Sequence, residues 1–289
     1  MEITILFPAD YFDLTKVDEQ FEAEYKEAIK LPEFNIAFYN HDAFVEGAQL
    51  RVHPEIEGGL CMARTWMLKP EEYSRLFSEL SQIGARLINS PHQYSLMHLF
   101  PNIYPQLSDA TPQIVAFSSI DSVNVDIINR HFEKFMIKDS VKSVKEWDFP
   151  KYFETPISAD DLNEYLKRFV ELRGNLYTGS IVFKEYIDLK HYEGKTNEYR
   201  VFYFYHHIVS ISPNSNQPEF APYLPGEVAR KYAGLGSLYY TVDFGETEQG
   251  SFIILETGDG QVSGLSPIQH VFKYYDEIRH IAGKHVVKQ

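Results

Sequence analysis

The sequence predicts an α/β (α+β) protein in which a domain of alternating strands and helices precedes a second part that is richer in strands. Within the first 105 residues, short apolar runs alternate with amphipathic helical segments. After a helix that ends at Gly174, strand patterns dominate as far as residue 256. At about 150 residues per domain, a chain of 289 residues is long enough for two domains. We therefore expect an N-terminal α/β domain over residues 1–105 and a second domain, with mixed and antiparallel sheets, over residues 106–289.

The expected N-terminal elements follow from apolar spacing and from residues that start or end helices. The first helix places Phe21, Tyr25 and Ile29 on one face, because they lie four residues apart. The second begins at Pro70, with two carboxylates in its first turn, and ends at Gly84. In order, the elements are a strand over 3–7, a helix over 17–29, a strand over 35–39, a helix over 70–83 and a strand over 86–89.

The second part is expected to hold two helices and several strands. Ser158 resembles the start of a capping box, and the helix that follows it ends at Gly174. Three prolines, Pro101, Pro105 and Pro112, favour loop around the domain boundary. The expected strands cover 135–138, 180–189, 198–211, 238–244 and 251–256, and a helix over about 267–282 closes the chain.

The composition excludes several classes of function. With 27 Lys+Arg against 41 Asp+Glu, the net charge is −14, which argues against a nucleic-acid partner because such proteins need a basic face. The single cysteine, Cys61, excludes an internal disulfide and zinc fingers. The first residues are too acidic for a signal peptide, and no run of about 18 apolar residues predicts a membrane span. We expect a cytoplasmic protein without a membrane partner.

The common catalytic motifs are absent from the sequence. There is no P-loop, no G-x-S-x-G elbow and no H-E-x-x-H. The glycines between Gly258 and Gly264 have the wrong spacing for a dinucleotide-binding fingerprint. His206 and His207 fall where the chain is expected to turn between two strands, so a solvated turn is the preferred interpretation.

Four basic residues stand in or beside apolar strands. Lys138 ends one strand and Lys142 follows in the next loop, while Lys184 and Arg200 lie inside two others. Burying such a charge is costly unless it is paired, so an anionic partner is implied. The alternative for each is a side chain that reaches solvent or forms a salt bridge.

Three carboxylates follow a similar pattern near the C-terminus. Asp243 and Glu256 each end an expected strand, and Asp259 lies just beyond the second one. Across a hairpin whose turn centres near Glu248, the first two become diagonal neighbours on one face. Converging carboxylate oxygens suit Mg²⁺ together with substrate phosphates, although an ordinary polar hairpin is the alternative.

Several stretches together carry a resemblance to one known family. They are residues 5–12, 64–73 with 86–94, Phe135-Met-Ile-Lys-Asp-Ser-Val-Lys-Ser143, Phe183-Lys-Glu-Tyr-Ile187 with Glu198-Tyr-Arg200, and Tyr240–Gly245 with Leu255-Glu-Thr-Gly-Asp-Gly-Gln-Val-Ser-Gly-Leu265. The chain resembles the ATP-grasp superfamily, and within it a divergent clade of bacterial and phage proteins. The likeness covers nearly the whole chain, and its last segment is the most specific.

The resemblance implies an ATP-grasp fold for residues 106–289 and a role for each matching residue. Lys138 and Lys184 would contact the ATP phosphates or the adenine edge, with Lys142 over the phosphates. Arg200 would stabilise charge on the γ-phosphate or on an acyl phosphate. The remaining implied contacts are the adenine hinge Glu185, Tyr186 and Ile187, the ribose ligand Glu198, and the Mg²⁺ ligands Asp243 and Glu256, with Asp259 as a third candidate.

The sequence departs from the family pattern in two places. Many members have Asn two residues after the metal Glu, where this chain has Gly258, and Asp259 would replace it. The glycine-rich phosphate loop is also missing, so Lys142 and Ser143 would build the lid. On the acceptor side, Arg64 would grip a carboxylate, with a structural ion pair as the alternative.

The resemblance implies a carboxylate–amine ligase that uses ATP and Mg²⁺ as cofactors. Phosphate passes to a substrate carboxylate, and an amine or another nucleophile attacks the acyl phosphate. The expected catalytic residues are then Arg200, Lys138 and Arg64. A kinase on the same fold and a non-catalytic nucleotide-binding module remain as alternatives. The expected partners are ATP and a small carboxylate or peptide acceptor, and a homodimer stays open.

Overall fold

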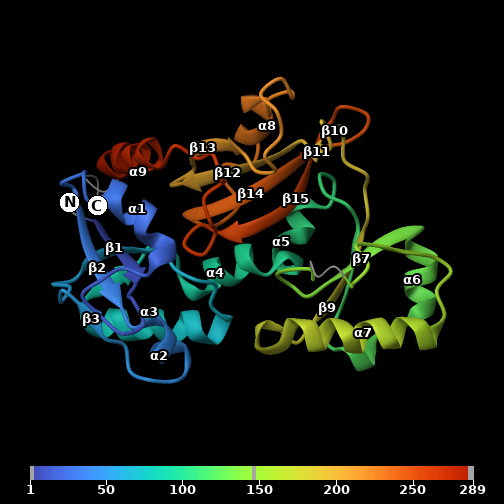
Figure 1. Ribbon diagram of the computed structural model, residues 1–289, viewed down its shortest axis with the longest axis horizontal. Helices are drawn as coiled ribbons and strands as arrows, with labels where there is room; N and C mark the ends of the chain where they lie inside the picture. Colours follow the sequence, from blue (N-terminus) through green and yellow to red (C-terminus); the bar gives the residue numbers. More distant parts are fainter. Residues whose placement is uncertain (1–2, 145–147, 286–289) are drawn as a thin grey trace.

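The computed structural model describes residues 3–144 and 148–285. It contains an N-terminal sheet, a small sheet and a larger antiparallel sheet. Figure 1 shows the larger sheet in orange between the blue N-terminal sheet and the green and yellow small sheet. Helices α4 and α5 run below the larger sheet, between the two flanking parts.

The N-terminal sheet has the strand order β3-β2-β1-β4-β5. Its strands are β1 (Ile3–Pro8), β2 (Phe34–Tyr39), β3 (Val52–His53), β4 (Gly59–Ala63) and β5 (Ala85–Leu87). All are parallel to their neighbours except β3, which is antiparallel to β2. The helices of this part are η1 (Glu19–Phe21), α1 (Glu22–Ala28), α2 (His41–Val45) and α3 (Pro70–Gln82).

Apolar side chains cover both faces of the N-terminal sheet. Ile5 on β1 packs in a cluster with α1 and with the C-terminal helix α9 (Val271–His285), whereas Leu6 faces α2 and α3. The expected strands and helices are present here, except that the first helix starts as 3₁₀ turn η1 after Asp18. Strand β4 was not predicted, because its four apolar residues are too short a run to separate strand from helix.

The region around the expected domain boundary is helical. Helices α4 (Pro91–His98) and α5 (Phe100–Leu107) replace the loop expected around Pro101 and Pro105. Pro101 occupies the first turn of α5, where a missing N–H leaves no helical bond unmade. Phe100 and Ile103 are buried, and this packing outweighs Pro105 inside the helix. The boundary at residue 105 falls within α5 and stays a prediction.

The small sheet has the order β6-β9-β7-β8, with every pair antiparallel. The elements of this part are β6 (Ile114–Phe117), η2 (Ile120–Ser122), α6 (Val125–His131), β7 (Lys134–Lys138), β8 (Phe153–Glu154), α7 (Ala159–Arg173), η3 (Gly174–Leu176) and β9 (Ile181–Glu185). The Ser158 side chain caps α7 as expected, and Gly174 ends it with a φ of 49°, a conformation that favours glycine.

The larger sheet is antiparallel, in the order β13-β12-β14-β15. The elements of this part are the hairpin β10 (His191–Tyr192) and β11 (Lys195–Thr196), then β12 (Glu198–Phe204), β13 (His207–Pro213), α8 (Gly226–Arg230), β14 (Tyr239–Glu246), β15 (Phe252–Asp259) and α9. The expected turn between β12 and β13 is present, with Tyr205 and His206 both at positive φ. No helix in the described ranges is long and apolar enough to cross a membrane.

Candidate active site

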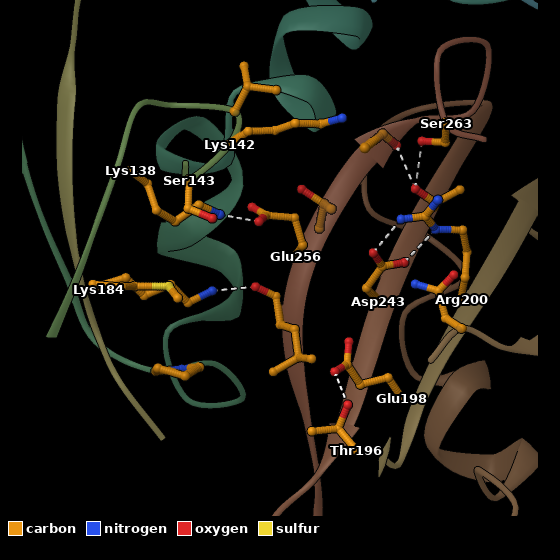
Figure 2. A pocket seen from close by; sticks show the side chains of 18 of the residues that line it. Lys138, Lys142, Ser143, Lys184, Thr196, Glu198, Arg200, Asp243, Glu256 and Ser263 are labelled. Carbon is orange, nitrogen blue, oxygen red and sulfur yellow. Dashed lines mark hydrogen bonds and ion pairs between the residues drawn. The ribbon is translucent and has the colours of Figure 1, made fainter. Parts of the chain in front are cut away.

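A cavity of about 690 Å³ lies between the small sheet and the larger sheet. Figure 2 shows lysines from the small-sheet side on the left and side chains of the larger sheet on the right, with Glu256 between them. The expected site residues that line it are Lys138, Lys142, Lys184, Glu185, Tyr186, Ile187, Glu198, Arg200, Asp243 and Glu256. Segments far apart in the sequence therefore meet at one cavity.

Lys138 and Lys184 form the cationic wall of this cavity. They lie on neighbouring strands β7 and β9, and Lys184 pairs with Met136, two residues before Lys138. Because side chains alternate along a strand, both lysines point from the same face of the small sheet. Both are buried. Lys138 Nζ pairs with the Glu256 carboxylate, and Lys184 Nζ donates to the Leu255 carbonyl, so the two ammonium groups join the two sheets.

Burial lowers the pKa of the Lys184 ammonium to about 7, although the nearby Glu256 carboxylate opposes this change. The Phe100 ring, whose centroid lies 4.2 Å from Nζ, supplies a further contact that favours the cation. An anion bound in the cavity would strengthen the charged form of Lys184. A buried lysine of this kind is therefore suited to a strongly anionic ligand.

Arg200 and Asp243 form a two-pronged ion pair on the opposite wall. They are direct cross-strand neighbours on β12 and β14. Arg200 Nε lies 2.8 Å from Asp243 Oδ1, and Nη2 lies 2.6 Å from Oδ2. The remaining nitrogen, Nη1, donates to the Gly264 carbonyl at 2.8 Å. This fork fixes the guanidinium plane at the edge of the cavity.

Glu256 is the carboxylate best suited to a metal ion. It lies directly opposite Asp243 in the β14–β15 register, rather than diagonally as expected, with a β-bulge beginning after this pair. Its Oε1 atom is buried and has no hydrogen-bond partner in the described part of the chain. Such an orphaned oxygen fits a cation, and Mg²⁺ binds through one or two carboxylates plus substrate phosphates. The described residues contain no group of three His, Cys, Asp or Glu that could hold a metal without a substrate.

The adenine hinge and the ribose candidate lie at the other end of the cavity. The hinge Glu185–Ile187 follows β9, and the Tyr186 amide donates to the Lys134 carbonyl at 2.9 Å. The Tyr186 ring packs 4.7 Å from that of Tyr152. Glu198 begins β12 and accepts a hydrogen bond from Thr196 Oγ1 at 2.5 Å. These residues are placed so that they could contact a base and a sugar.

A short turn holds the loop of Lys142 and Ser143 without any glycine. One oxygen of the buried Asp139 carboxylate accepts from the Val141 amide at 2.8 Å and from the Lys142 amide at 2.7 Å. The other oxygen accepts from Arg173 Nε at 2.9 Å. Sequence reasoning missed Asp139. An aspartate directly after a buried strand, two and three residues before the amides that it binds, is the signal that could have found it.

The structure does not bring Arg64 into the cavity. Its side chain is 1% exposed and forms an ion pair with Glu24, with Nε 2.8 Å from Oε2 and Nη2 2.9 Å from Oε1. This is the structural alternative considered from the sequence. The expected grip on a substrate carboxylate has no support from this position.

Asp259 also lies outside the cavity lining. It is fully buried and accepts hydrogen bonds from Asn89 Nδ2 at 2.5 Å and from the Gln261 amide at 3.0 Å. Burial raises the pKa of its carboxyl group to about 6, despite these hydrogen bonds. Because side chains alternate on β15, Asp259 points to the face opposite Glu256 apart from any local irregularity. Its contacts are those of a residue that shapes the next loop.

His98 is a cavity residue that sequence reasoning did not select. It is the last residue of α4, is 5% exposed and lines the cavity. Its ring packs 4.8 Å from that of Tyr94, and burial together with the Lys142 charge lowers its pKa to about 3. Only the packing of α4 against β15 brings it near the site.

Comparison with known proteins agrees with this architecture. The D-alanine–D-alanine ligase from Bacillus anthracis superposes with a TM-score of 0.60 at 15% identity, covering 98% of both chains. The ATP-grasp ligase PsnB, complexed with a minimal precursor, gives 0.59 at 12% identity, covering 96% of this chain and 98% of that one. A RimK domain ATP-grasp protein from Sphaerobacter thermophilus gives 0.59 at 14% identity, again covering 96% and 98%. No curated protein matches the chain in sequence.

These likenesses confirm the predicted fold class, an α/β protein with the ATP-grasp fold. They also agree with the order of the elements, since almost the full length of each chain is covered. Residues 126–278, more than half of the chain, match an ATP-grasp domain family that is described as family 3 of its clade. The chain belongs to this ATP-grasp family.

Proposed function

We propose that this protein is an ATP- and Mg²⁺-dependent ligase that activates a carboxylate as an acyl phosphate and joins it to an amine or another nucleophile. The observation that carries the proposal is the Glu256 carboxylate, which pairs with Lys138 through one oxygen and leaves the other buried without a partner among the described residues. Two buried lysines, an arginine and two carboxylates around one cavity supply the groups that phosphoryl transfer needs.

The cationic wall would bind the phosphates of ATP. Lys138 and Lys184 point into the cavity from one face of the small sheet, and Lys142 lies on the adjoining loop. The hinge Glu185–Ile187 would receive adenine, and Glu198 the ribose. When a polyphosphate enters, the lysines exchange contacts with protein oxygens for contacts with phosphate, which keeps their charges compensated.

Asp243 and Glu256 would hold Mg²⁺, which when bound neutralises charge on the β- and γ-phosphates. Arg200 Nη1 and the Arg200–Asp243 fork orient a positive charge at the same edge. This guanidinium would stabilise the negative charge that develops on the transferring phosphoryl group.

The reaction would take place in two balanced steps. A substrate carboxylate oxygen forms a bond to the γ-phosphorus as the bond to ADP breaks, which produces an acyl phosphate. The nucleophile then forms a bond to the acyl carbon, phosphate leaves, and the proton of the nucleophile passes to phosphate or solvent. The protein would position both reactants and exclude bulk water. ATP use also supports a cytoplasmic location.

The acceptor class is proposed from the neighbours and the open cavity. One similar structure is a D-alanine–D-alanine ligase, and another, PsnB, was solved with a precursor peptide. We propose a small carboxylate or a peptide as the acceptor here. A kinase on the same site would give a stable phosphorylated product, which transfer of labelled γ-phosphate from ATP would reveal.

One observation favours a second candidate, a nucleotide-binding module without turnover. A Cβ atom at Gly258 would lie 2.6 Å from Ser263 Oγ and 2.9 Å from Thr241 Oγ1. The Asn ligand that many family members have two residues after the metal Glu therefore does not fit without a shift of both neighbours. A site with two carboxylates would bind Mg²⁺ more weakly than one with a third ligand.

The test is the thermal unfolding midpoint with ATP, with Mg²⁺ and with both. A ligand present at about 100 times its dissociation constant stabilises by roughly 2.7 kcal/mol, or a few degrees in a protein of this size. We expect a joint ATP–Mg²⁺ shift in the wild type and in Glu248→Gln, an exposed change in the same hairpin. Glu256→Gln should lose the joint shift, and a wild type without any shift would refute the proposed nucleotide site.

Turnover separates the two candidates. With amino-acid and peptide mixtures as acceptors, ADP release that Lys184→Ala and Glu256→Gln abolish would support the ligase. Near-normal ADP release in both variants would end it. Tight ATP binding without ADP release from any mixture would favour the binding module.

A further inference from the structure

The loop between β15 and α9 forms one wall of the cavity but has no regular structure of its own. Val262, Ser263 and Gly264 line the cavity. Within residues 260–264, only a weak turn from the Val262 amide to Asp259 bonds the backbone to itself. The conformation of this wall must therefore come from contacts with other parts of the chain.

Those contacts come from three consecutive residues at the carboxyl end of β4. Arg64 Nη1 donates to the Gly260 carbonyl at 2.5 Å and to the Ser263 carbonyl at 2.9 Å. The Thr65 amide donates to the Gln261 carbonyl at 2.9 Å, and the Ala63 amide donates to Gln261 Oε1 at 3.0 Å. The N-terminal sheet thus holds the carbonyls of a loop that is distant from it in the sequence.

Glu24 on α1 fixes the arginine that makes two of these contacts. It binds Nε and Nη2 of Arg64 with its two oxygens and also accepts from the Tyr275 hydroxyl at 2.7 Å. The ring of Phe202 lies 5.8 Å from the guanidinium carbon. A buried ion pair of this kind adds little stability over apolar packing, so its retention requires another explanation. A fork that binds a carboxylate and two carbonyls at once is a task that only arginine can perform.

The same loop contacts the arginine of the candidate active site. Its next carbonyl, that of Gly264, accepts from Arg200 Nη1 at 2.8 Å, while the other Arg200 nitrogens bind Asp243. Figure 2 shows Ser263 beside Arg200 and Asp243 at this edge. Two guanidiniums therefore hold adjacent carbonyls of one loop, one from each side.

We propose that the Glu24–Arg64 pair is a positioning clamp, which uses the N-terminal sheet to hold loop 260–264 and thereby aims Arg200 at the reacting groups. Its effect on turnover rests on the proposed function, whereas its effect on the loop does not. Arg64 is then a positioning residue that acts on substrates only through the loop and Arg200. This role differs from the substrate grip expected from the sequence.

Amide hydrogen exchange of the full chain tests the clamp without any ligand. In Arg64→Lys, the ammonium group cannot serve Glu24 and both carbonyls together, so exchange in residues 260–265 should accelerate by about tenfold or more. Exchange in β14 and β15 should stay within about twofold of the wild type. Glu24→Gln, which keeps the shape and removes the charge, should give a smaller acceleration in the same segment.

Arg279→Lys is the matched control. Arg279 also pairs with a glutamate of the N-terminal part, Glu33, and with Asp276, but it does not touch the loop. It should leave exchange in residues 260–265 unchanged. If Arg64→Lys and Glu24→Gln both exchange in this segment as the wild type does, the clamp is refuted. If Arg64→Met fails to fold, these two milder variants still decide.

A kinetic split tests the connection to Arg200. With water as the acceptor, Arg64→Lys should lower kcat for ATP hydrolysis by about tenfold and leave KM for ATP within about twofold. A rise in KM with kcat unchanged would overturn the connection to Arg200. Absence of any ATP–Mg²⁺ stabilisation in the wild type would refute the proposed function, and the exchange result would still decide the clamp.

Discussion

Asp243 and Glu256 face each other across β14 and β15, but they differ in how their oxygens are used. Both Asp243 oxygens bind Arg200, whereas one Glu256 oxygen binds Lys138 and the other has no partner in the described structure. One carboxylate therefore holds the arginine in place, and the other keeps a free ligand position. This asymmetry assigns Glu256 the leading role in metal binding within the proposed site.

Arg200→Lys should separate binding from turnover. A lysine cannot make the fork to Asp243 and reach the Gly264 carbonyl as well, so charge at the reacting phosphoryl group would be misplaced. We expect ATP–Mg²⁺ stabilisation within a few degrees of the wild type and ADP release reduced roughly 100-fold. Arg168→Lys, at an exposed pair with Asp148, is the control and should change neither quantity. Undiminished ADP release in Arg200→Lys would contradict the proposed role.

Lys184→Met should make the protein more stable and lose nucleotide affinity. The ammonium group is buried, and desolvation lowers its pKa to about 7, so the folded protein holds this charge at a cost. Replacing such a charge by an apolar side chain of similar length should raise the unfolding free energy by at least ~1 kcal/mol. Urea unfolding at pH 7 measures the gain, and the midpoint shift with ATP and Mg²⁺ measures the loss. A less stable variant that still binds ATP would contradict both expectations.

Asp259→Asn should leave the magnesium dependence intact. Asp259 binds Asn89 and Gln261 and does not line the cavity, so we expect it to shape the loop and not to bind metal. The new amide would place a donor against Asn89 Nδ2, at a cost of about 1–3 kcal/mol in stability. The midpoint shift with ATP as a function of Mg²⁺ concentration is the measurement. Loss of the Mg²⁺ effect, as in Glu256→Gln, would make Asp259 a ligand after all.

His98 should make the folded state sensitive to acid. Burial and the Lys142 charge hold the pKa of His98 at about 3 in the folded protein, below its ordinary value of 6.5. Between these values the unfolded chain binds a proton that the folded chain does not, so stability falls as the pH falls. The loss from this group between pH 7 and pH 5 is ~2 kcal/mol.

The comparison of wild type and His98→Gln isolates this contribution. Glutamine has no charge to gain, so the difference in unfolding free energy between pH 7 and pH 5 should be smaller in the variant by about that amount. Urea titrations at the two pH values provide the measurement. An equal loss in both proteins would show that His98 is protonated without cost in the folded state.

Local sequence was sufficient for the strands that carry the cationic wall and the carboxylates. Lys138 and Lys184 were placed on apolar strands, and Asp243 and Glu256 at a hairpin, from apolar runs and turn residues alone. These signals are local and repeat every two residues, so they survive without knowledge of the fold. Their roles toward ATP and Mg²⁺ stay proposals.

Other parts of the site depend on contacts between distant segments. Strand β4 and helix α5 were missed because burial outweighs their weak local signals. His98 reaches the cavity only because α4 packs against β15, and no pattern around it indicates this. The direct pairing of Asp243 with Glu256 depends on a β-bulge that spacing does not reveal.

Arg64 and Arg200 show the division most clearly. Both are arginines in apolar surroundings, and the sequence by itself determined that each needs an anionic or carbonyl partner, because an unpaired buried charge is too costly. Only the tertiary structure decided which partner each received: Glu24 and a loop for Arg64, Asp243 and an open cavity for Arg200. Side-chain partners depend on which distant segments pack together, and the local periodicity that specifies strands and helices carries no information about that packing.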